Sequence, residues 1–189
     1  MTCIVGIADQ KTGSVFIGGD SASVEGWMLQ TSAPKVFYNH PFVAGYTTSF
    51  RMGQLLQYRM RIDRPSTVYD LNYWMVDSFI PRWQETLKDN GWLKTKDGRE
   101  EGGEFLIGLY GRLFIVSDDF QVQPRNYCAV GCGAEIALGS LFTTESMNKP
   151  SKERVHIALQ AAEAHSAGVR GPMYYMELTK EGQDIFDWY

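Results

Sequence analysis

The residues best suited to chemistry stand at the start of the sequence, where Met1 precedes Thr2. Aminopeptidases remove an initiator Met when the next residue is small, so we expect a mature chain that begins at Thr2. That residue would then carry both a hydroxyl and a free α-amine. A threonine hydroxyl is a poor nucleophile until a base takes its proton, and an N-terminal amine is one such base. The alternative is that Thr2 simply follows Met1, as in many proteins.

Three further residues stand where predicted strands begin or end. Asp20 ends a strand after two glycines, and Lys35 begins another. If these strands lie side by side, the Lys35 ammonium would lower the pKa of the Thr2 hydroxyl while Asp20 holds the lysine in place. Gly45 ends an apolar strand and would offer an unhindered backbone N–H to an oxyanion. The structural alternatives are a solvated Asp20, a solvated Lys35 and a turn at Gly45.

The hydrophobic pattern predicts the elements that would position these residues. Strand-like and helix-like stretches occur in blocks and do not alternate as in a doubly wound sheet. We therefore expect an α+β fold, a four-layered αββα sandwich of two antiparallel sheets flanked by helices. The predicted strands are 2–9, 14–20, 27–30, 35–39, 41–47, two within 104–123 joined at 110–111, 126–131 and 172–179, and the predicted helices are 49–60, 67–89, 133–144 and 151–168.

Three local features refine this prediction. Pro81 lies inside the second predicted helix and should kink or break it near Ile80. Ser151 is a suitable N-cap for the last helix. The segment 94–103, KTKDGREEGG, is charged and rich in glycine, and we expect a mobile or partner-facing loop there.

Composition limits the class of protein. With 189 residues, 44% hydrophobic and 21% charged, the sequence is typical of one globular domain covering residues 1–189. A net charge of −4 gives no electrostatic support for a nucleic-acid partner. No apolar run approaches the roughly 20 residues of a membrane span, and no signal peptide is evident. We therefore expect a cytoplasmic protein without a membrane partner.

The cysteines and histidines do not predict a cofactor site. Cys3, Cys128 and Cys132 cannot all pair, and they lack the spacing of zinc ligands. Nothing in the sequence requires a metal or organic cofactor. Cys3 would be a better nucleophile than a hydroxyl as a thiolate, but its side chain must point to the opposite face of its strand from that of Thr2. We expect Cys3 to lie in the core.

Five ordered segments resemble a known family. TCIVGI, VFIGGDS, the Lys35-Val36 pair, FVAGYT and AVGCGAEIALGSL occur in the order and nearly the spacing of proteasome β-subunits and of HslV, their bacterial peptidase relative. The segments PKVFYN, SFRMGQLLQY and HSAGVRGP look closest to proteasome-like proteins of actinobacterial phages. The resemblance covers most of the chain and implies an N-terminal nucleophile (Ntn) hydrolase, in the host cytoplasm if phage-encoded.

The resemblance also implies roles for single residues. Thr2 matches the N-terminal nucleophile, Asp20 the carboxylate after the first hairpin and Lys35 the lysine that tunes the nucleophile. Gly45 matches the glycine whose N–H faces the oxyanion. Cys132 falls where the family has a serine that helps the terminal amine exchange protons. A thiol is a weaker donor than a hydroxyl, so Cys132 acting as an apolar filler is the alternative.

A second departure from the family pattern lies near the C-terminus. Many relatives carry an Asp followed three residues later by a Ser, just before paired glycines. In this chain Ser166 takes the Asp position and Val169 takes the Ser position. The network around the amine is therefore expected to be incomplete, or rebuilt with His165 or Arg170.

The leading hypothesis is a threonine peptidase that works through an acyl-enzyme. A catalytically inactive ring or assembly protein and a small-molecule amidase are the alternatives. By resemblance we expect a homo-oligomeric ring acting on peptides or unfolded proteins, with an ATPase unfoldase as a possible partner. Val43 and Thr47 flank Gly45 and are expected near the specificity pocket.

Overall fold

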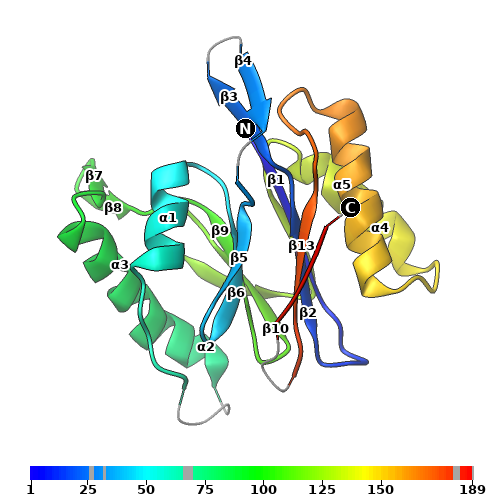
Figure 1. Ribbon diagram of the computed structural model, residues 1–189. Helices are drawn as coiled ribbons and strands as arrows, with labels where there is room; N and C mark the ends of the chain where they lie inside the picture. Colours follow the sequence, from blue (N-terminus) through cyan, green and yellow to red (C-terminus); the bar gives the residue numbers. More distant parts are fainter. Residues whose placement is uncertain (26–27, 32, 66–69, 181–183, 189) are drawn as a thin grey trace.

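The fold is a sandwich of two five-stranded antiparallel sheets with helices on both outer faces (Figure 1). It was established from a computed structural model that describes residues 1–189 except 26–27, 32, 66–69, 181–183 and 189. The four layers are those expected from the sequence. Each sheet therefore has one face toward the other sheet and one face toward helices, which explains why its central strands are apolar along their whole length.

The first sheet contains the N-terminal hairpin at its centre. Strands β1 and β2 pair with Ile4 opposite Gly19, and β1 also pairs with β12. The sheet has the order β12-β1-β2-β13-β14. Its strands are β1 (Cys3–Ala8), β2 (Val15–Gly19), β12 (Tyr127–Gly131), β13 (Tyr174–Leu178) and β14 (Asp184–Trp188).

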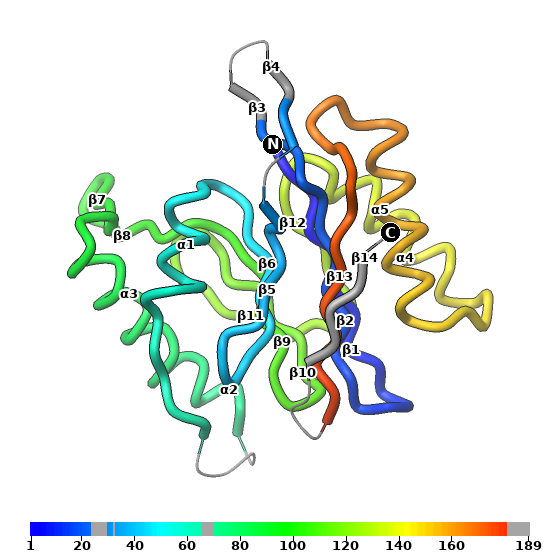
Figure 2. Tube along the Cα trace, viewed as in Figure 1, coloured from blue at the N-terminus to red at the C-terminus, as the bar shows by residue number. Residues whose placement is uncertain are grey.

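The second sheet has the order β11-β10-β9-β6-β5. Its central strands, β6 and β9, are buried throughout. The strands are β5 (Val36–Asn39), β6 (Phe42–Tyr46), β9 (Phe105–Leu109), β10 (Arg112–Val116) and β11 (Val122–Arg125). A separate hairpin, β3 (Ala22–Glu25) with β4 (Met28–Thr31), extends beyond the end of the sandwich near the N-terminus (Figures 1 and 2).

Helices cover the two outer faces unequally. The first sheet is covered by α4 (Ala134–Glu145) and α5 (Ser151–His165), which pack on β1, β2 and β12. The second is covered by α1 (Phe50–Tyr58), α2 (Leu71–Trp74), the π-helical segment η1 (Met75–Phe79) and α3 (Ile80–Asp89) (Figure 1). The helix does not break before Pro81, because Phe79 and Ile80 keep helical dihedral angles; the change near this residue is the π-helical turn that ends at Phe79.

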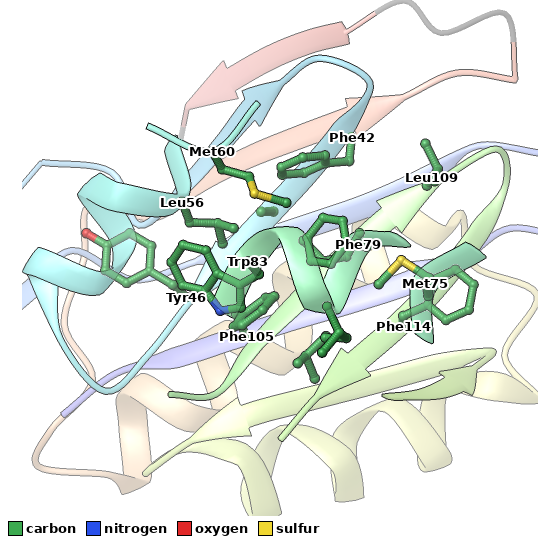
Figure 3. Close-up of a cluster of buried hydrophobic side chains, with 14 of the residues drawn as sticks. Phe42, Tyr46, Leu56, Met60, Met75, Phe79, Trp83, Phe105, Leu109 and Phe114 are labelled. Carbon is green, nitrogen blue, oxygen red and sulfur yellow. The ribbon is translucent and has the colours of Figure 1, made fainter. Parts of the chain in front are cut away.

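Three apolar clusters fill the spaces between the layers. The space under α1 and α3 is the most aromatic, with Phe79, Trp83 and Phe105 fully buried and stacked at tilted or edge-to-face angles (Figure 3). A second cluster joins the first sheet to α4 and α5, and a third lies between the sheets around Ile4 and Val43.

The structure corrects three local predictions. Residues 94–103 are not a simple loop, because β7 (Lys94–Lys96) and β8 (Arg99–Glu101) pair across Asp97-Gly98. Both turn residues have positive φ, of 51° and 77°, as a type I′ hairpin turn requires. Ser151 is not the cap but the first residue of α5, and its hydroxyl donates to Asp9 Oδ2 at 2.8 Å. Strand β14 was not anticipated. In the part of the chain described, no helix is long and apolar enough to cross a membrane.

Close packing between the sheets predicts the effect of adding one methyl group. A Cβ on Gly108 of β9 would lie 2.6 Å from Val15 Cγ1 and 2.7 Å from Val43 Cγ2. Because such an overlap forces side chains from their preferred rotamers, we expect Gly108→Ala to lower the free energy of unfolding by about 1–3 kcal/mol. The measurement is urea denaturation followed by circular dichroism.

A matched control for this change lies in α4. A Cβ on Gly139 would have no heavy atom within 4 Å. We expect Gly139→Ala to raise the free energy of unfolding by about 0.5–1 kcal/mol, because alanine loses less backbone conformational entropy than glycine when the helix folds. Equal effects of the two substitutions would contradict the packing argument.

Candidate active site

Three residues expected to act together meet at one end of the sandwich. Thr2 directly precedes β1, and Asp20 directly follows β2, its antiparallel neighbour. The Asp20 N–H donates to the Cys3 carbonyl at 3.2 Å, which extends the hairpin by one hydrogen bond. Lys35 directly precedes β5 of the opposite sheet. The two sheets thus bring residues from positions 2, 20 and 35 into one small volume.

The Lys35 ammonium connects the three side chains. Its Nζ donates to Thr2 Oγ1 at 2.6 Å and to Asp20 Oδ1 at 3.0 Å. All three residues are buried, with exposed fractions of 6% for Thr2, 0% for Asp20 and 1% for Lys35. A buried ion pair needs its remaining polar atoms satisfied, because desolvating the two charges costs several kcal/mol each.

Backbone donors satisfy the remaining capacity of the Asp20 carboxylate. Oδ1 also accepts from the Cys3 N–H at 3.0 Å, and Oδ2 accepts from the Ala22 N–H at 3.0 Å. The Arg170 N–H donates to Oδ2 at 3.4 Å from the distant segment before β13. These bonds orient the carboxylate, which in turn positions the lysine.

The electrostatic environment of Lys35 has two opposing parts. Burial lowers the pKa of its ammonium below the ordinary lysine value, while the charge of Asp20 and its hydrogen bond act to raise it. On the solvent side, the Phe50 ring centroid lies 5.9 Å from Nζ. A cation 2.6 Å from a hydroxyl favours the ionised form of that hydroxyl.

Met1 occupies the space in front of Thr2. The Thr2 hydroxyl donates to the Met1 carbonyl oxygen, and Lys35 Nζ lies 3.4 Å from the same oxygen. While this peptide bond is intact, the Thr2 nitrogen is an amide that cannot act as a base. The chemistry expected from the sequence therefore depends on cleavage between these two residues.

Cys132 lies beside the Thr2 backbone, where the sequence prediction put it. The Thr2 N–H donates to Cys132 Sγ at 3.2 Å, and the thiol lies 3.4 Å from the Thr2 carbonyl oxygen. Ser166 Oγ lies 3.8 Å from the same sulfur, at the C-terminal end of α5. Gly168 leaves room for this cluster, because a Cβ there would lie 2.7 Å from Sγ.

His165 and Arg170 were considered as replacements for the family network, but their side chains do not join it. Val169 does not join it either, because it is fully buried in the cluster under α4 and α5. Arg170 contributes its backbone, which donates to Asp20 and accepts from Ser21. No hydrogen bond of the His165 ring is present among the described residues. Of these positions, only Ser166 reaches the sulfur with a side chain.

The Cys3 side chain lies in the apolar core, as expected, although its backbone bonds to Asp20. Its side chain is fully buried with Val5 in the core beneath α5. Burial, followed by the negative charge of Asp20, raises the pKa of the Cys3 thiol to about 12. Because the thiolate is the nucleophilic form, Cys3 is chemically inert at neutral pH.

Gly45 is not placed as expected. Directly after β6, the Thr47 N–H donates to the Glu104 carbonyl, and Gly45 of β6 is paired with Leu106 two residues earlier along the same ladder. Hydrogen-bonded pairs alternate along an antiparallel ladder, so the Gly45 N–H is directed at β9 inside the sheet. It cannot face the Thr2 hydroxyl, and the role expected from the resemblance is corrected on this ground.

A small cavity of about 40 Å³ lies directly in front of Thr2 and Lys35. Thr47 lines this cavity, whereas Val43 points between the sheets and does not line it. The other lining residues are Met1, Tyr46, Thr48, Ser49 and Phe50. Sequence reasoning missed Thr48, Ser49 and Phe50, because no motif marks the turn between a strand and a helix.

The assembled groups fit acyl transfer and lack the features of a metal centre. Among the described residues, no group of three or more His, Cys, Asp and Glu side chains is placed to hold a metal ion. A hydroxyl beside a buried cation, with an adjacent nitrogen that becomes an amine on removal of Met1, supplies a nucleophile and a base within one residue.

Comparison with solved structures identifies the fold. The sequence matches no protein-family model and no curated protein. Among solved structures, one of BPH from Thiobacillus denitrificans in complex with epoxomicin aligns with this chain at a TM-score of 0.78 and 17% sequence identity. The alignment covers 94% of this chain and 98% of that one. A second BPH structure gives 0.77 and 18%, over 95% and 98%. HslV from Trypanosoma brucei gives 0.66 and 14%, over 94% and 99%. The chain has the fold that BPH and HslV share.

The buried pair predicts a large loss of stability when one partner is removed. Lys35→Met would leave the Asp20 carboxylate buried without its cation, so we expect the free energy of unfolding to fall by about 3–5 kcal/mol. The double variant Lys35→Met, Asp20→Asn should lose less, because no uncompensated charge remains. Urea denaturation of the three proteins measures both effects.

The control for this prediction is Lys149→Met. Lys149 forms an ion pair with Glu153 on the surface, with side chains 34% and 45% exposed. Water screens such a pair, and we expect a change of less than about 1 kcal/mol. A comparable loss from Lys149→Met, or a double variant less stable than Lys35→Met alone, would refute the account of the buried pair.

The three cysteines are expected to differ in reactivity. Cys132 is exposed, whereas burial shields Cys3 and Cys128 and raises the pKa of both thiols. Treatment of folded protein with iodoacetamide at pH 8 should alkylate Cys132 and leave the other two unmodified, as measured by peptide mass spectrometry. In urea all three should react. Alkylation of Cys3 in the folded protein would contradict its placement.

Proposed function

We propose that this chain is an N-terminal threonine hydrolase that cleaves peptide bonds after Met1 is removed. The observation that carries the proposal is the 2.6 Å contact between Thr2 Oγ1 and the buried Lys35 ammonium, which Asp20 holds in place. A surface threonine has no such partner. Burying a lysine beside a hydroxyl costs free energy, and activation of the hydroxyl is a function that explains why the lysine is buried there.

The proposed reaction proceeds through an ester. Thr2 Oγ1 attacks the substrate carbonyl carbon while the α-amine of Thr2 takes the hydroxyl proton. The Lys35 ammonium stabilises the developing charge on Oγ1. The protonated amine then gives its proton to the leaving nitrogen as the C–N bond breaks. Water, deprotonated by the same amine, hydrolyses the ester and restores the Thr2 hydroxyl.

Cys132 and Ser166 have a supporting role in this proposal. Cys132 Sγ lies 3.2 Å from the Thr2 nitrogen, and Ser166 Oγ lies 3.8 Å from the sulfur. Once the nitrogen is an amine, the thiol can accept a hydrogen bond from it and relay protons to Ser166. Because a thiol is a weak donor, we expect this relay to be slower than one through a hydroxyl.

The structural neighbours support the choice of substrate. One BPH structure contains epoxomicin, and HslV shares the fold. By the resemblance given above, we propose a homo-oligomeric ring acting on peptides or unfolded proteins, with an ATPase unfoldase as a possible partner. Phage origin and a host-cytoplasmic location stay predictions.

A second candidate is a catalytically inactive assembly protein. It is favoured by one observation, the contact of the Thr2 hydroxyl and of Lys35 with the Met1 carbonyl. If Met1 is retained, these groups are occupied and no amine is available to act as a base. The two candidates differ in one peptide bond, which makes them separable by mass spectrometry.

The test uses a chain whose terminus is known. A protein released from an N-terminal fusion so that it begins at Thr2 is incubated with a peptide vinyl sulfone and with epoxomicin. We expect a covalent adduct on the Thr2 peptide and hydrolysis of a peptide library, because the hydroxyl and amine are then both available. Simple amide substrates assayed in parallel identify a small-molecule amidase.

Two controls accompany this test. Thr2→Ala should lose the adduct and at least 10³-fold in kcat, because the nucleophile is absent. The chain that retains Met1, confirmed by intact mass, should also fail to react. Absence of any adduct on a folded protein with a proven Thr2 terminus would overturn the proposal and leave the assembly role.

A further inference from the structure

The peptide bond between Met1 and Thr2 is enclosed, although Met1 itself is exposed. Its carbonyl oxygen accepts from the Thr2 hydroxyl and lies 3.4 Å from Lys35 Nζ, and its N–H donates to Cys132 Sγ at 3.2 Å. The stem of the Met1 side chain packs on the loop after α5, where a Cβ on Gly168 would lie 2.7 Å from Met1 Cβ. The exposed fraction falls from 65% at Met1 to 6% at Thr2. An enzyme can therefore touch the first residue without reaching the bond behind it.

The residues that follow this bond are held on both sides. Strand β1 begins at Cys3 in the middle of the first sheet, with Cys3 opposite Gly131 of β12 and Ile4 opposite Gly19 of β2. All six residues of the strand are buried. A protease cuts a folded chain through the fraction of molecules in which the segment has opened. A chain end that leads into a central strand has two neighbours to leave, so this fraction is small.

Freeing the bond would also remove partners from the buried ion pair. An aminopeptidase binds the residues on both sides of the bond that it cuts, so it must draw out Thr2 together with the start of β1. The Cys3 N–H would then leave Asp20 Oδ1, to which it donates at 3.0 Å, and the Thr2 hydroxyl would leave Lys35 Nζ. Both buried charges would lose a partner in the same step. We therefore expect the required opening to be as rare as unfolding of the whole domain.

The contacts of the Thr2 hydroxyl do not support self-cleavage. Thr2 Oγ1 would have to lose its proton in order to attack the Met1 carbonyl carbon. Among the hydrogen bonds described, this hydroxyl contacts the Met1 carbonyl oxygen and the Lys35 ammonium. A carbonyl oxygen is a very weak base, an ammonium is a donor, and the Thr2 nitrogen is an amide while Met1 is attached. The cut therefore needs a separate aminopeptidase.

We propose that Met1 is removed by an aminopeptidase only before the chain folds, and that folding with Met1 attached fixes the inactive form. Water splits the amide C–N bond: its hydroxyl goes to the methionine carbonyl carbon and its hydrogen to the Thr2 nitrogen, which becomes the free amine. Competition between processing and folding then sets the fraction of active molecules. The timing concerns the N-terminus alone, whereas its consequence for activity rests on the proposed function.

The test uses the full-length chain made in a reconstituted translation system that contains deformylase but no aminopeptidase, so that every molecule keeps Met1. Purified methionine aminopeptidase is added either during synthesis or after folding, and intact mass follows the loss of one methionine residue. A peptide of residues 1–10 gives the rate for the same bond without the fold. We expect removal from the nascent chain and from the peptide. The folded chain should react at least about 10³-fold more slowly than the peptide, because only its unfolded fraction is a substrate.

Two substitutions outside the site separate global from local opening. Gly108→Ala is expected to destabilise the domain through overlap with Val15 and Val43, and Gly139→Ala is expected to stabilise it. If the whole domain must open, Gly108→Ala should speed removal from the folded chain about 5–150-fold and Gly139→Ala should slow it about 2–5-fold, in proportion to the changes in stability. Should Gly108→Ala fail to fold, Gly139→Ala alone gives the comparison.

Three outcomes would overturn this proposal. They are a folded chain processed as fast as the peptide, a folded chain that loses Met1 without any aminopeptidase, and processing of the glycine variants at the wild-type rate. Failure of the proposed function is distinct from all three. In that case the chain processed during synthesis would have the mass of a protein that begins at Thr2, and would neither react with the vinyl sulfone nor hydrolyse peptides.

Discussion

The structure depends on one buried interaction, the contact of Lys35 with Asp20 and Thr2 between the ends of the two sheets. Two charges are removed from water here, and each needs partners to offset the lost hydration. The carboxylate accepts backbone N–H groups from Cys3, Ala22 and Arg170. Segments from three parts of the chain are therefore fixed around a single side chain, and the lysine crosses from the other sheet to meet it.

The same burial accounts for the chemistry that the site can perform. Desolvation lowers the pKa of the Lys35 ammonium, and the charge of the adjacent Asp20 carboxylate acts in the opposite direction by favouring the charged form. In a medium of low polarity, that charge acts on the Thr2 hydroxyl more strongly than it would in water. The contact between Lys35 and the Thr2 hydroxyl is present while Met1 is attached, whereas the base of the proposed reaction becomes available only when Met1 is removed. Under the proposed function, the peptide bond between Met1 and Thr2 separates an inactive scaffold of this geometry from an enzyme.

Most of the fold and part of the site followed from local patterns in the sequence. Runs of buried residues predicted β1, β2, β6 and β9, and helical spacing predicted α5, because burial on both faces or on one stripe has a direct signature. The meeting of Thr2, Asp20 and Lys35 required only that their strands end at the same edge. The hairpin at 94–103 was missed, since its residues are all polar and its signal is the Asp97-Gly98 turn alone. Strand β14 lies beyond the last segment that had been assigned to a strand.

Gly45 shows why a motif glycine does not by itself identify an oxyanion donor. A Cβ at this position would overlap Ile4 Cγ2 and would lie 3.0 Å from Ile17 Cγ2, so close approach of the sheets already requires glycine. The direction of its N–H is set by the register with β9, which no local pattern encodes. Positive φ occurs instead at Thr48, a residue type that gives no sequence signal for it. Packing between the sheets thus accounts for the glycine at this position, and only the register shows where its N–H points.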